Sequence, residues 1–239
     1  MKFDAAGLLD LILPRACVSC GAPMGEGIVC SSCWLRMPAL PSPRCDRCGH
    51  PRREGPCTFC DLLPPFVRAA RSVCWVPSDA SSAAVHALKY DGWTAVAEGM
   101  ATRMARLSWP PDVVAERGVV IPVPLAPTRL RERGYNQAAL LAQPLARRWG
   151  IACDELALER TRHTVTQTKL TPSERSTNVH GAFRVSEGTL SRVAGAHVVL
   201  VDDVLTTGST LNAAASALFD AGTRILSYVT FGRARTAAD

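Results

Sequence analysis

The stretch that decides the fold is residues 197–219, HVVLVDDVLTTGSTLNAAASALF. A continuously apolar run ends in the paired carboxylates Asp202 and Asp203, and TTGST at 206–210 makes a turn. Apolar side chains then recur at helical spacing, and residues 224–231 give the next apolar run. A fully apolar strand followed by a turn and a helix is typical of a parallel sheet that helices cover on both faces. The stretch therefore predicts an α/β fold.

Further strands and helices are expected upstream of this unit. Strands are predicted at residues 73–76, 118–123 and 156–159, and helices at 81–89, 95–107 and 136–149. The sequence DLLPP at 61–65 breaks regular structure before the first of these strands. We therefore expect the α/β domain, a parallel sheet with helices on both faces, to occupy residues 66–239.

The N-terminal part is dominated by cysteine. Eight of the ten cysteines form four CxxC pairs, and two such pairs complete a tetrahedral zinc site with four thiolate ligands. Sequential pairing leaves nine and eight residues between the pairs, which indicates two ribbons in tandem, while an interleaved cross-brace is the alternative. A redox CxxC or an iron–sulfur cluster is less consistent with four pairs outside a βαβ frame. The predicted ligands of two structural Zn2+ ions are Cys17, Cys20, Cys30, Cys33, Cys45, Cys48, Cys57 and Cys60.

Residues 1–65 are expected to form a double zinc ribbon preceded by an amphipathic helix at 8–13. This part has few large apolar side chains, so metal binding must supply much of its folding free energy. We expect chelation to unfold it and to leave the α/β domain, with its own core, intact. Cys74 and Cys153 lie outside the pattern and are predicted to be buried free thiols.

Composition limits the class of protein. The chain has 239 residues, is 47% apolar and 20% charged, and carries a net charge of +6. Its apolar runs are too short for a bilayer span, and Asp4 and Asp10 interrupt the one stretch that imitates a signal peptide. A cytoplasmic protein without a membrane span is predicted. The positive charge permits an anionic partner.

The chemistry is predicted at the end of the strand that precedes the TTGST turn. Ligands of parallel sheets bind where strands end. Free backbone N–H groups and hydroxyls at a helix N-terminus suit a phosphate, and two carboxylates can accept hydrogen bonds from vicinal hydroxyls. The combination describes a ribose 5-phosphate, and neither GxxxxGK[ST] nor GxGxxG is present. The alternative is a strand end and a helix cap without a ligand. We expect both carboxylates to face the ligand, outside the core.

VVLVDDVLTTGST at 198–210 resembles the phosphoribosyl pyrophosphate (PRPP) signature of type I phosphoribosyltransferases. The wider resemblance is to the ComF family of bacterial competence-associated proteins. It rests on IPVPL at 121–125, RERGYNQA at 131–138, residues 160–183 and the cysteine pairs, and it covers essentially the whole chain.

The resemblance implies binding of PRPP with Mg2+. The residues implied in catalysis are Asp202, Asp203, Lys169 and Arg175, the last two on a lid at 160–177. Those implied in substrate binding are Thr206, Thr207, Gly208, Ser209 and Thr210 for the 5-phosphate and Arg129, Arg131 and Arg133 for pyrophosphate. Lys89 and Tyr90 also match a family position, with an open role.

Two functions follow from the resemblance. The first is an enzyme that transfers the 5-phosphoribosyl group. The second is a PRPP-binding or scaffold protein without turnover, which acts in competence and DNA uptake through single-stranded DNA or a protein partner at the zinc module. An aromatic content of 6% is low for a surface that stacks bases. The sequence names neither the acceptor nor the oligomeric state.

Overall fold

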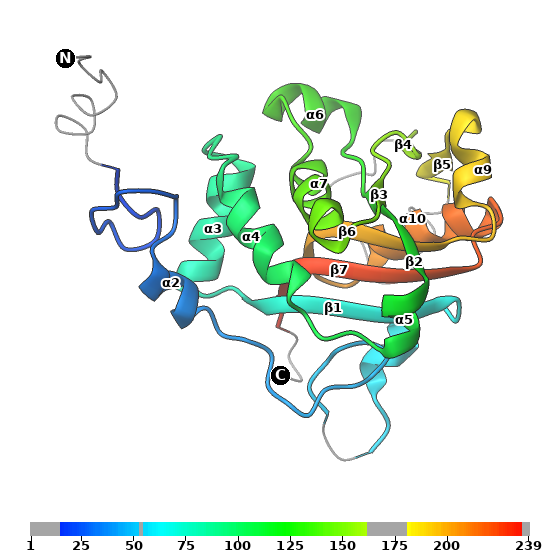
Figure 1. Ribbon diagram of the computed structural model, residues 1–239, viewed down its shortest axis with the longest axis horizontal. Helices are drawn as coiled ribbons and strands as arrows, with labels where there is room; N and C mark the ends of the chain where they lie inside the picture. The colour runs from blue at the N-terminus through cyan, green and yellow to red at the C-terminus, as the bar shows by residue number, and fades with distance from the viewer. Residues whose placement is uncertain (1–14, 53–54, 162–180, 236–239) are drawn as a thin grey trace, which may run out of the picture.

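The computed structural model describes residues 15–52, 55–161 and 181–235. Its centre is a five-stranded sheet in the order β1-β7-β6-β2-β3 (Figure 1). All four pairings are parallel. The strands are β1 (Val67–Val76), β2 (Arg117–Pro122), β3 (Ala152–Cys153), β6 (His197–Leu205) and β7 (Ile225–Ala234). The predicted parallel sheet is confirmed.

One face of the sheet is covered by α3 (Asp79–Lys89), α4 (Val96–Ala105) and α7 (Gln137–Trp149). Their buried side chains, such as Leu88, Met100 and Leu141, join one apolar cluster with Val199 and Phe231 of the sheet. Side-chain caps start two of these helices. The Ser78 hydroxyl accepts from the Ser81 N–H, and the Asn136 side-chain carbonyl accepts from the Ala138 N–H.

The opposite face carries α10 (Ser209–Asp220) and a separate antiparallel pair, β4 (Leu158–Arg160) and β5 (Phe183–Val185). Leu211 and Leu218 of α10 pack with Leu200 and Tyr228 in a second apolar cluster. Helices thus lie on both faces, as predicted. The remaining elements are α2 (Ser31–Arg36), η1 (Thr58–Leu62), α5 (Pro111–Glu116), α6 (Pro127–Arg133), η3 (Glu187–Thr189) and α9 (Leu190–Val193).

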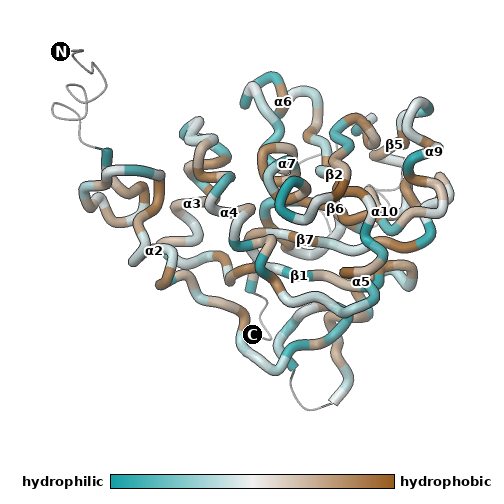
Figure 2. The backbone as a smooth tube through the Cα atoms, viewed as in Figure 1, coloured by the Kyte–Doolittle hydropathy of each residue, from teal (hydrophilic) through white to brown (hydrophobic). Residues whose placement is uncertain are grey.

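Three of the expected segments differ from the prediction, and β3 and α5 were not expected. β1 begins at Val67, well before residue 73, because most of its residues are buried beside β7 despite Arg68 and Arg71. The loop expected after β2 contains helix α6, which Pro127 starts and Gly134 ends at a φ of +80°. The strand expected at 156–159 begins at Leu158 and pairs with β5, outside the main sheet. Figure 2 shows hydrophobic stretches in the sheet and a largely hydrophilic α6.

Residues of both cysteine-rich ribbons belong to the two apolar clusters. Val29 and Met37 of the first ribbon pack in the cluster that holds α3, α4 and α7. Phe59 and Leu63 of the second ribbon pack in the cluster that holds α10. The ribbons therefore add to the cores on the two faces of the sheet. The boundary at 65/66 stays a prediction, and the helix expected at 8–13 lies outside the described residues.

Both remaining cysteines have raised thiol pKa values. Cys74 is buried, and burial raises its pKa to about 12. Cys153 is half-buried, and burial, helped by Glu155 and Asp154, raises its pKa to about 11. Both side chains thus favour the neutral thiol at pH 7. Within the described parts of the chain, no helix is long and apolar enough to cross a bilayer.

Candidate functional site

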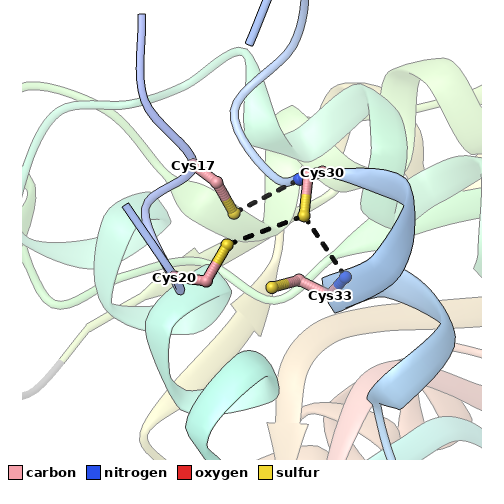
Figure 3. A group of neighbouring side chains, drawn as sticks. All are labelled: Cys17, Cys20, Cys30 and Cys33. Carbon is pink, nitrogen blue, oxygen red and sulfur yellow. Dashed lines mark hydrogen bonds between the residues drawn. The ribbon is translucent and has the colours of Figure 1, made fainter. Parts of the chain in front are cut away.

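The eight paired cysteines form two clusters. Cys17, Cys20, Cys30 and Cys33 make the first, and Cys45, Cys48, Cys57 and Cys60 make the second, with the ligand atoms of each cluster within 4.8 Å of one another. In Figure 3 the four sulfurs of the first cluster point toward a common centre. The sulfurs of Cys20 and Cys30 in the first cluster lie 3.8 Å apart. In the second cluster, the sulfurs of Cys45 and Cys60 and those of Cys48 and Cys57 lie 3.4 Å apart. Tetrahedral Zn–S bonds of about 2.3 Å need a separation of about 3.8 Å, so the clusters fit zinc. The sequential pairing is confirmed over the interleaved one.

Hydrogen-bond donors surround the sulfurs of the first cluster. The Cys30 N–H donates to the Cys17 sulfur at 3.3 Å, and Arg36 Nη2 donates to the Cys33 sulfur at 3.1 Å. Burial by itself raises the pKa of Cys17, but the surrounding N–H groups outweigh it and lower this pKa to about 6. Because zinc binds the thiolate form, these donors favour the metal-binding state.

The acidic pair lies where β6 extends beyond the end of β2. Asp203 is only 3% exposed, and its Oδ2 lies 2.5 Å from Nζ of Lys89, at the C-terminal end of α3. Gln137, the first residue of α7, donates from Nε2 to Asp203 Oδ1 at 3.4 Å. The expectation that both carboxylates lie outside the core is wrong for Asp203, because the ammonium of Lys89 compensates its charge and permits burial.

Asp202 is in a different environment. It is half-buried, and its Oδ1 accepts a hydrogen bond from the Asp203 N–H at 2.8 Å. Burial, followed by the nearby charge of Asp203, raises the pKa of Asp202 well above its ordinary value. Burial lowers the pKa of Arg160, and the negative charge of Asp202 partly offsets this decrease. A partner that offers hydroxyl donors or positive charge would favour the ionised form of Asp202.

The turn at 206–210 connects β6 to α10 and stands beside this pair. Thr206 and Thr207 are exposed, and Gly208 takes a φ of +80°, a left-handed conformation that suits glycine. The hydroxyls of Thr207 and Ser209 are hydrogen-bonded at 2.8 Å. The turn leads into the N-terminus of a twelve-residue helix, where N–H groups without helical partners favour an anion.

Helix α6 brings two of the three predicted arginines toward the acidic pair. Arg133 Nη1 donates to Gln137 Oε1 at 2.5 Å, and Gln137 reaches Asp203. Arg129 and Arg133 also line a cavity of about 370 Å3 together with Lys89. Arg131 is exposed and is not among the described residues that line this cavity. Arg129 and Arg133 thus share a cavity with Lys89, and Arg129 also forms an ion pair with Glu132 at 3.1 Å. The role of all three arginines in pyrophosphate binding stays a prediction.

A second cavity, of about 650 Å3, lies between α6, α7 and β4. Leu130, Leu140 and Leu156 give it apolar walls, and Glu159 and Arg160 give it charge. Asp202 and Asp203 are not among the described residues that line this cavity. Arg160 is the lining residue whose pKa responds to the charge of Asp202.

The sequence missed residues that come to the site from distant elements. Lys89, Gln137 and Arg160 surround the acidic pair. All three lie in stretches that carry the family resemblance, but the sequence assigned none of them a role at this pair. Gln137 lies in the RERGYNQA stretch, in which only the arginines were assigned to ligand binding. Lys169 and Arg175 lie outside the described residues, so their placement stays a prediction.

Two domain families match the chain. The double zinc ribbon domain matches residues 8–74, and the phosphoribosyl transferase domain matches residues 136–239. With the parallel sheet and the two four-cysteine clusters, these matches define a protein of the phosphoribosyltransferase fold class with an N-terminal double zinc ribbon.

Three relatives identify the family within this class, and two of them match over most of their length. The chain is 33% identical to the DNA utilization protein YhgH of Escherichia coli over 216 residues, which covers 84% of this chain and 89% of that protein. It is 26% identical to the competence protein ComFC of Bacillus subtilis over 201 residues, covering 81% and 79% of the two chains. The competence protein F of Haemophilus influenzae is 44% identical over 93 residues, covering 39% of this chain and 40% of that protein. The chain belongs to the ComF family.

Among solved structures, a glutamine PRPP amidotransferase from Bacillus subtilis matches with 21% identity and a TM-score of 0.38. The match covers 56% of this chain and 25% of that chain. At this similarity, no detail of that enzyme is transferred to this chain.

Proposed function

We propose that this protein binds PRPP with Mg2+ at the carboxyl end of β6 and transfers its 5-phosphoribosyl group. The observation that carries the proposal is the juxtaposition of three groups of different chemistry: the exposed turn at 206–210, the acidic pair with its partner Lys89, and the cations Arg129 and Arg133, which share a cavity with Lys89. They match in turn the phosphate, the vicinal hydroxyls and the pyrophosphate of PRPP.

Each group has a defined task in this proposal. The N–H groups and hydroxyls at the start of α10 bind the 5-phosphate. Asp202 accepts hydrogen bonds from the ribose hydroxyls, and Asp203, once PRPP draws Lys89 or Gln137 away from it, does the same; both stabilise the positive charge that develops on the ring. The bond from C1 to the pyrophosphate oxygen breaks while C1 bonds to a nucleophile, which loses a proton. Arg129 and Arg133 stabilise the departing pyrophosphate.

The proposed Mg2+ would be held largely by substrate oxygens and water. Lys89 already neutralises the carboxylate of Asp203. Asp202 and Asp203 therefore do not form a dedicated cage for the ion. Lys169 and Arg175 enter the proposal through the family resemblance alone, as groups that close over bound PRPP. Cysteines grouped in zinc-site geometry agree with the expected cytoplasmic location, since disulfides are rare there.

Calorimetric titration with PRPP, with and without Mg2+, tests the binding step. A screen for pyrophosphate release over nucleobases, ammonia and water then tests transfer and searches for the acceptor. Saturable binding that Asp202→Asn combined with Asp203→Asn abolishes is the expected result. Binding without release over all acceptors would leave a PRPP-binding protein without turnover, and no binding at all would overturn the proposal.

A second candidate, a contact with single-stranded DNA, is favoured by an exposed group of aromatic rings. Tyr90 is 66% exposed and Trp93 is 51% exposed, and the His86 ring lies 5.0 Å from that of Tyr90. The Arg133 guanidinium sits 5.4 Å from the centre of the Tyr90 ring. Exposed rings beside arginines suit stacked bases and their phosphates. All three relatives reported above are named for DNA utilization or competence.

Electrophoretic shift titrations with a single-stranded oligonucleotide at several salt concentrations test this contact. Tyr90→Ala with Trp93→Ala should weaken the complex at every salt concentration, since stacking contributes about 1–3 kcal/mol per base. Changing Arg133 should also flatten the logarithmic salt slope by roughly 0.7 if one phosphate contact is lost. Changing Arg36, Arg44 and Arg52 of the ribbons is the comparison that would place the DNA on the zinc module instead. Absence of a complex at low salt would remove this candidate.

A further inference from the structure

We infer that Asn212 is a positioning residue that ties the ligand-binding turn at 206–210 to the second zinc ribbon. The inference concerns the shape of the turn, and it rests on the proposed function for the identity of the ligand, PRPP. It gives the second ribbon a role in ligand binding that the cysteine pattern alone does not suggest.

Asn212 makes three contacts with three different parts of the protein. Its backbone N–H donates to the Gly208 carbonyl at 2.8 Å, which closes the first turn of α10. Its side-chain Nδ2 donates to the Leu62 carbonyl at 2.7 Å, and its Oδ1 accepts from the Tyr228 hydroxyl at 3.1 Å. Tyr228 is fully buried on β7. One residue thus holds the start of α10 between the ribbon and the sheet.

The ribbon end of this link belongs to the second metal cluster. Leu62 is the last residue of η1, which Cys57 precedes and which contains Cys60. The Leu63 N–H donates to the Cys60 carbonyl at 3.1 Å, so the backbone near Leu62 follows the position of Cys60. Two of the four thiols of the second cluster therefore help to determine where the Leu62 carbonyl points.

The second ribbon is itself fixed firmly to the sheet. Arg47 Nε donates to the carbonyl of Val67 on β1 at 3.2 Å, and its Nη atoms hold the ribbon together through the carbonyls of Cys60, Leu63 and Pro64. Arg233 of β7 donates from Nη2 to the Cys48 carbonyl at 2.6 Å. These charged hydrogen bonds make the ribbon a firm support for α10.

The first ribbon is placed differently. Its Trp34 lies under the Arg103 guanidinium, 3.7 Å from the ring centre, and edge-on to Phe231 at 6.1 Å. These contacts belong to the face that carries α4, opposite α10. The first ribbon is therefore the natural control, because it contributes to the fold from the other side of the sheet.

The shape of the turn matters because its N–H groups must converge on one anion. A turn that is held in shape before binding loses less conformational freedom when the ligand arrives. Glycine is flexible, so Gly208 permits the left-handed conformation of this turn without holding the turn in it. The hydrogen bonds of Asn212 to the ribbon and the sheet therefore help to keep the turn in shape. Removing this tether should weaken ligand binding more than it weakens the fold.

The test compares Asn212→Ala with Ser216→Ala, one turn further along α10. Amide hydrogen exchange without ligand should quicken in residues 206–212 for Asn212→Ala and stay unchanged for Ser216→Ala. PRPP affinity should fall about tenfold for Asn212→Ala, the typical effect of one or two lost hydrogen bonds. Tyr228→Phe removes the other contact of the amide and should shift both readouts in the same direction.

Cysteine variants then connect the turn to the metal cluster. Both Cys60→Ser and Cys20→Ser should quicken exchange generally, because each removes a zinc ligand, but only Cys60→Ser should quicken it in 206–212 beyond that general change. In the Asn212→Ala background, Cys60→Ser should add little at this turn, because the link is already broken. If Cys60→Ser fails to fold, the exchange rates of Asn212→Ala and Tyr228→Phe decide whether the inference holds.

Unchanged exchange at 206–212 in both Asn212→Ala and Tyr228→Phe would overturn the inference. Uniformly faster exchange over the whole chain in these two variants would also overturn it, since that result indicates a general loss of stability. Failure of the wild-type protein to bind PRPP, with local exchange still quickened by Asn212→Ala, would refute the proposed function and leave the tether in place.

Discussion

Asp202 and Asp203 are neighbours in sequence, but of the two only Asp203 forms an ion pair with a cation among the described residues. Asp203 is buried beside the ammonium of Lys89, whereas burial and the charge of Asp203 raise the pKa of Asp202. The two carboxylates therefore contribute differently to stability, and single substitutions should separate them.

Asp202→Asn should maintain or raise the free energy of unfolding at pH 7. The pKa of Asp202 is higher in the folded than in the unfolded protein, so ionising it costs stability as the pH rises above about 3.9. Asp203→Asn should instead cost about 2 kcal/mol, because the Lys89 side chain, 22% exposed, loses its partner. Urea unfolding of both variants checks this difference. Equal destabilisation by the two changes would contradict the assignment.

His197 should make stability depend on pH. It is buried, its Nε2 lies 2.9 Å from the Ser227 hydroxyl, and burial lowers its pKa to about 4. The unfolded state takes up a proton near pH 6.5, so stability should fall by about 3 kcal/mol as the pH drops from 6.5 to 4. Urea unfolding of the wild type and His197→Gln over this range isolates the effect. Parallel curves for the two proteins would show that His197 is not responsible.

At the scale of elements, helix α6 occupies part of a predicted loop. The helix determines which of its three arginines point in the same direction. In a helix, Arg129 and Arg133 lie four residues apart on one side, whereas Arg131 projects elsewhere. An extended loop would have imposed no such separation.

Single alanine substitutions in α6 should therefore differ in their effect on PRPP binding. Arg129→Ala and Arg133→Ala should each weaken it by about tenfold to a hundredfold, the loss expected for a hydrogen bond to a charged group. Arg131→Ala should stay within about twofold of the wild type and serves as the control for net charge. Calorimetric titration measures all three, and a comparable loss for Arg131→Ala would contradict the role of the helix.

At the scale of the whole molecule, the ribbons and the α/β domain share their apolar clusters. Cys33 of the first ribbon belongs to the same cluster as Met100 of α4, and Cys48 of the second to that of Tyr228 of β7. The sequence predicted a metal-dependent module beside a domain with its own core. The shared clusters change the expected response to metal removal.

Native mass spectrometry should show two Zn2+ ions per chain, one for each group of four cysteines. Chelation should lower the thermal midpoint of the entire chain in one transition, because each structural site contributes on the order of 10 kcal/mol. Far-UV circular dichroism checks this result, since the long helices α3, α4, α7 and α10, which dominate the helical signal, lie outside the ribbons. One zinc per chain, or helices unaffected by chelation, would contradict the shared core.

The sequence by itself determined the features that local chemistry dictates. The apolar run at 197–201 predicts a buried strand because water must be excluded along it, and spacing in the CxxC pairs suffices for two four-thiol sites. TTGST after two carboxylates marks the proposed ligand-binding turn. These signals lie within a few residues of one another, where covalent connection fixes their relative placement.

Only the tertiary structure decided how distant residues meet. Lys89 reaches Asp203 from a separate helix, and Asn212 reaches Leu62 across 150 positions of sequence, because the parallel sheet brings the ends of separate elements to one edge. Sequential rather than interleaved cysteine pairing, the helix at α6 and the burial of Asp203 also depend on packing. Such contacts leave no local pattern, since each partner is an ordinary lysine, asparagine or aspartate until the chain folds.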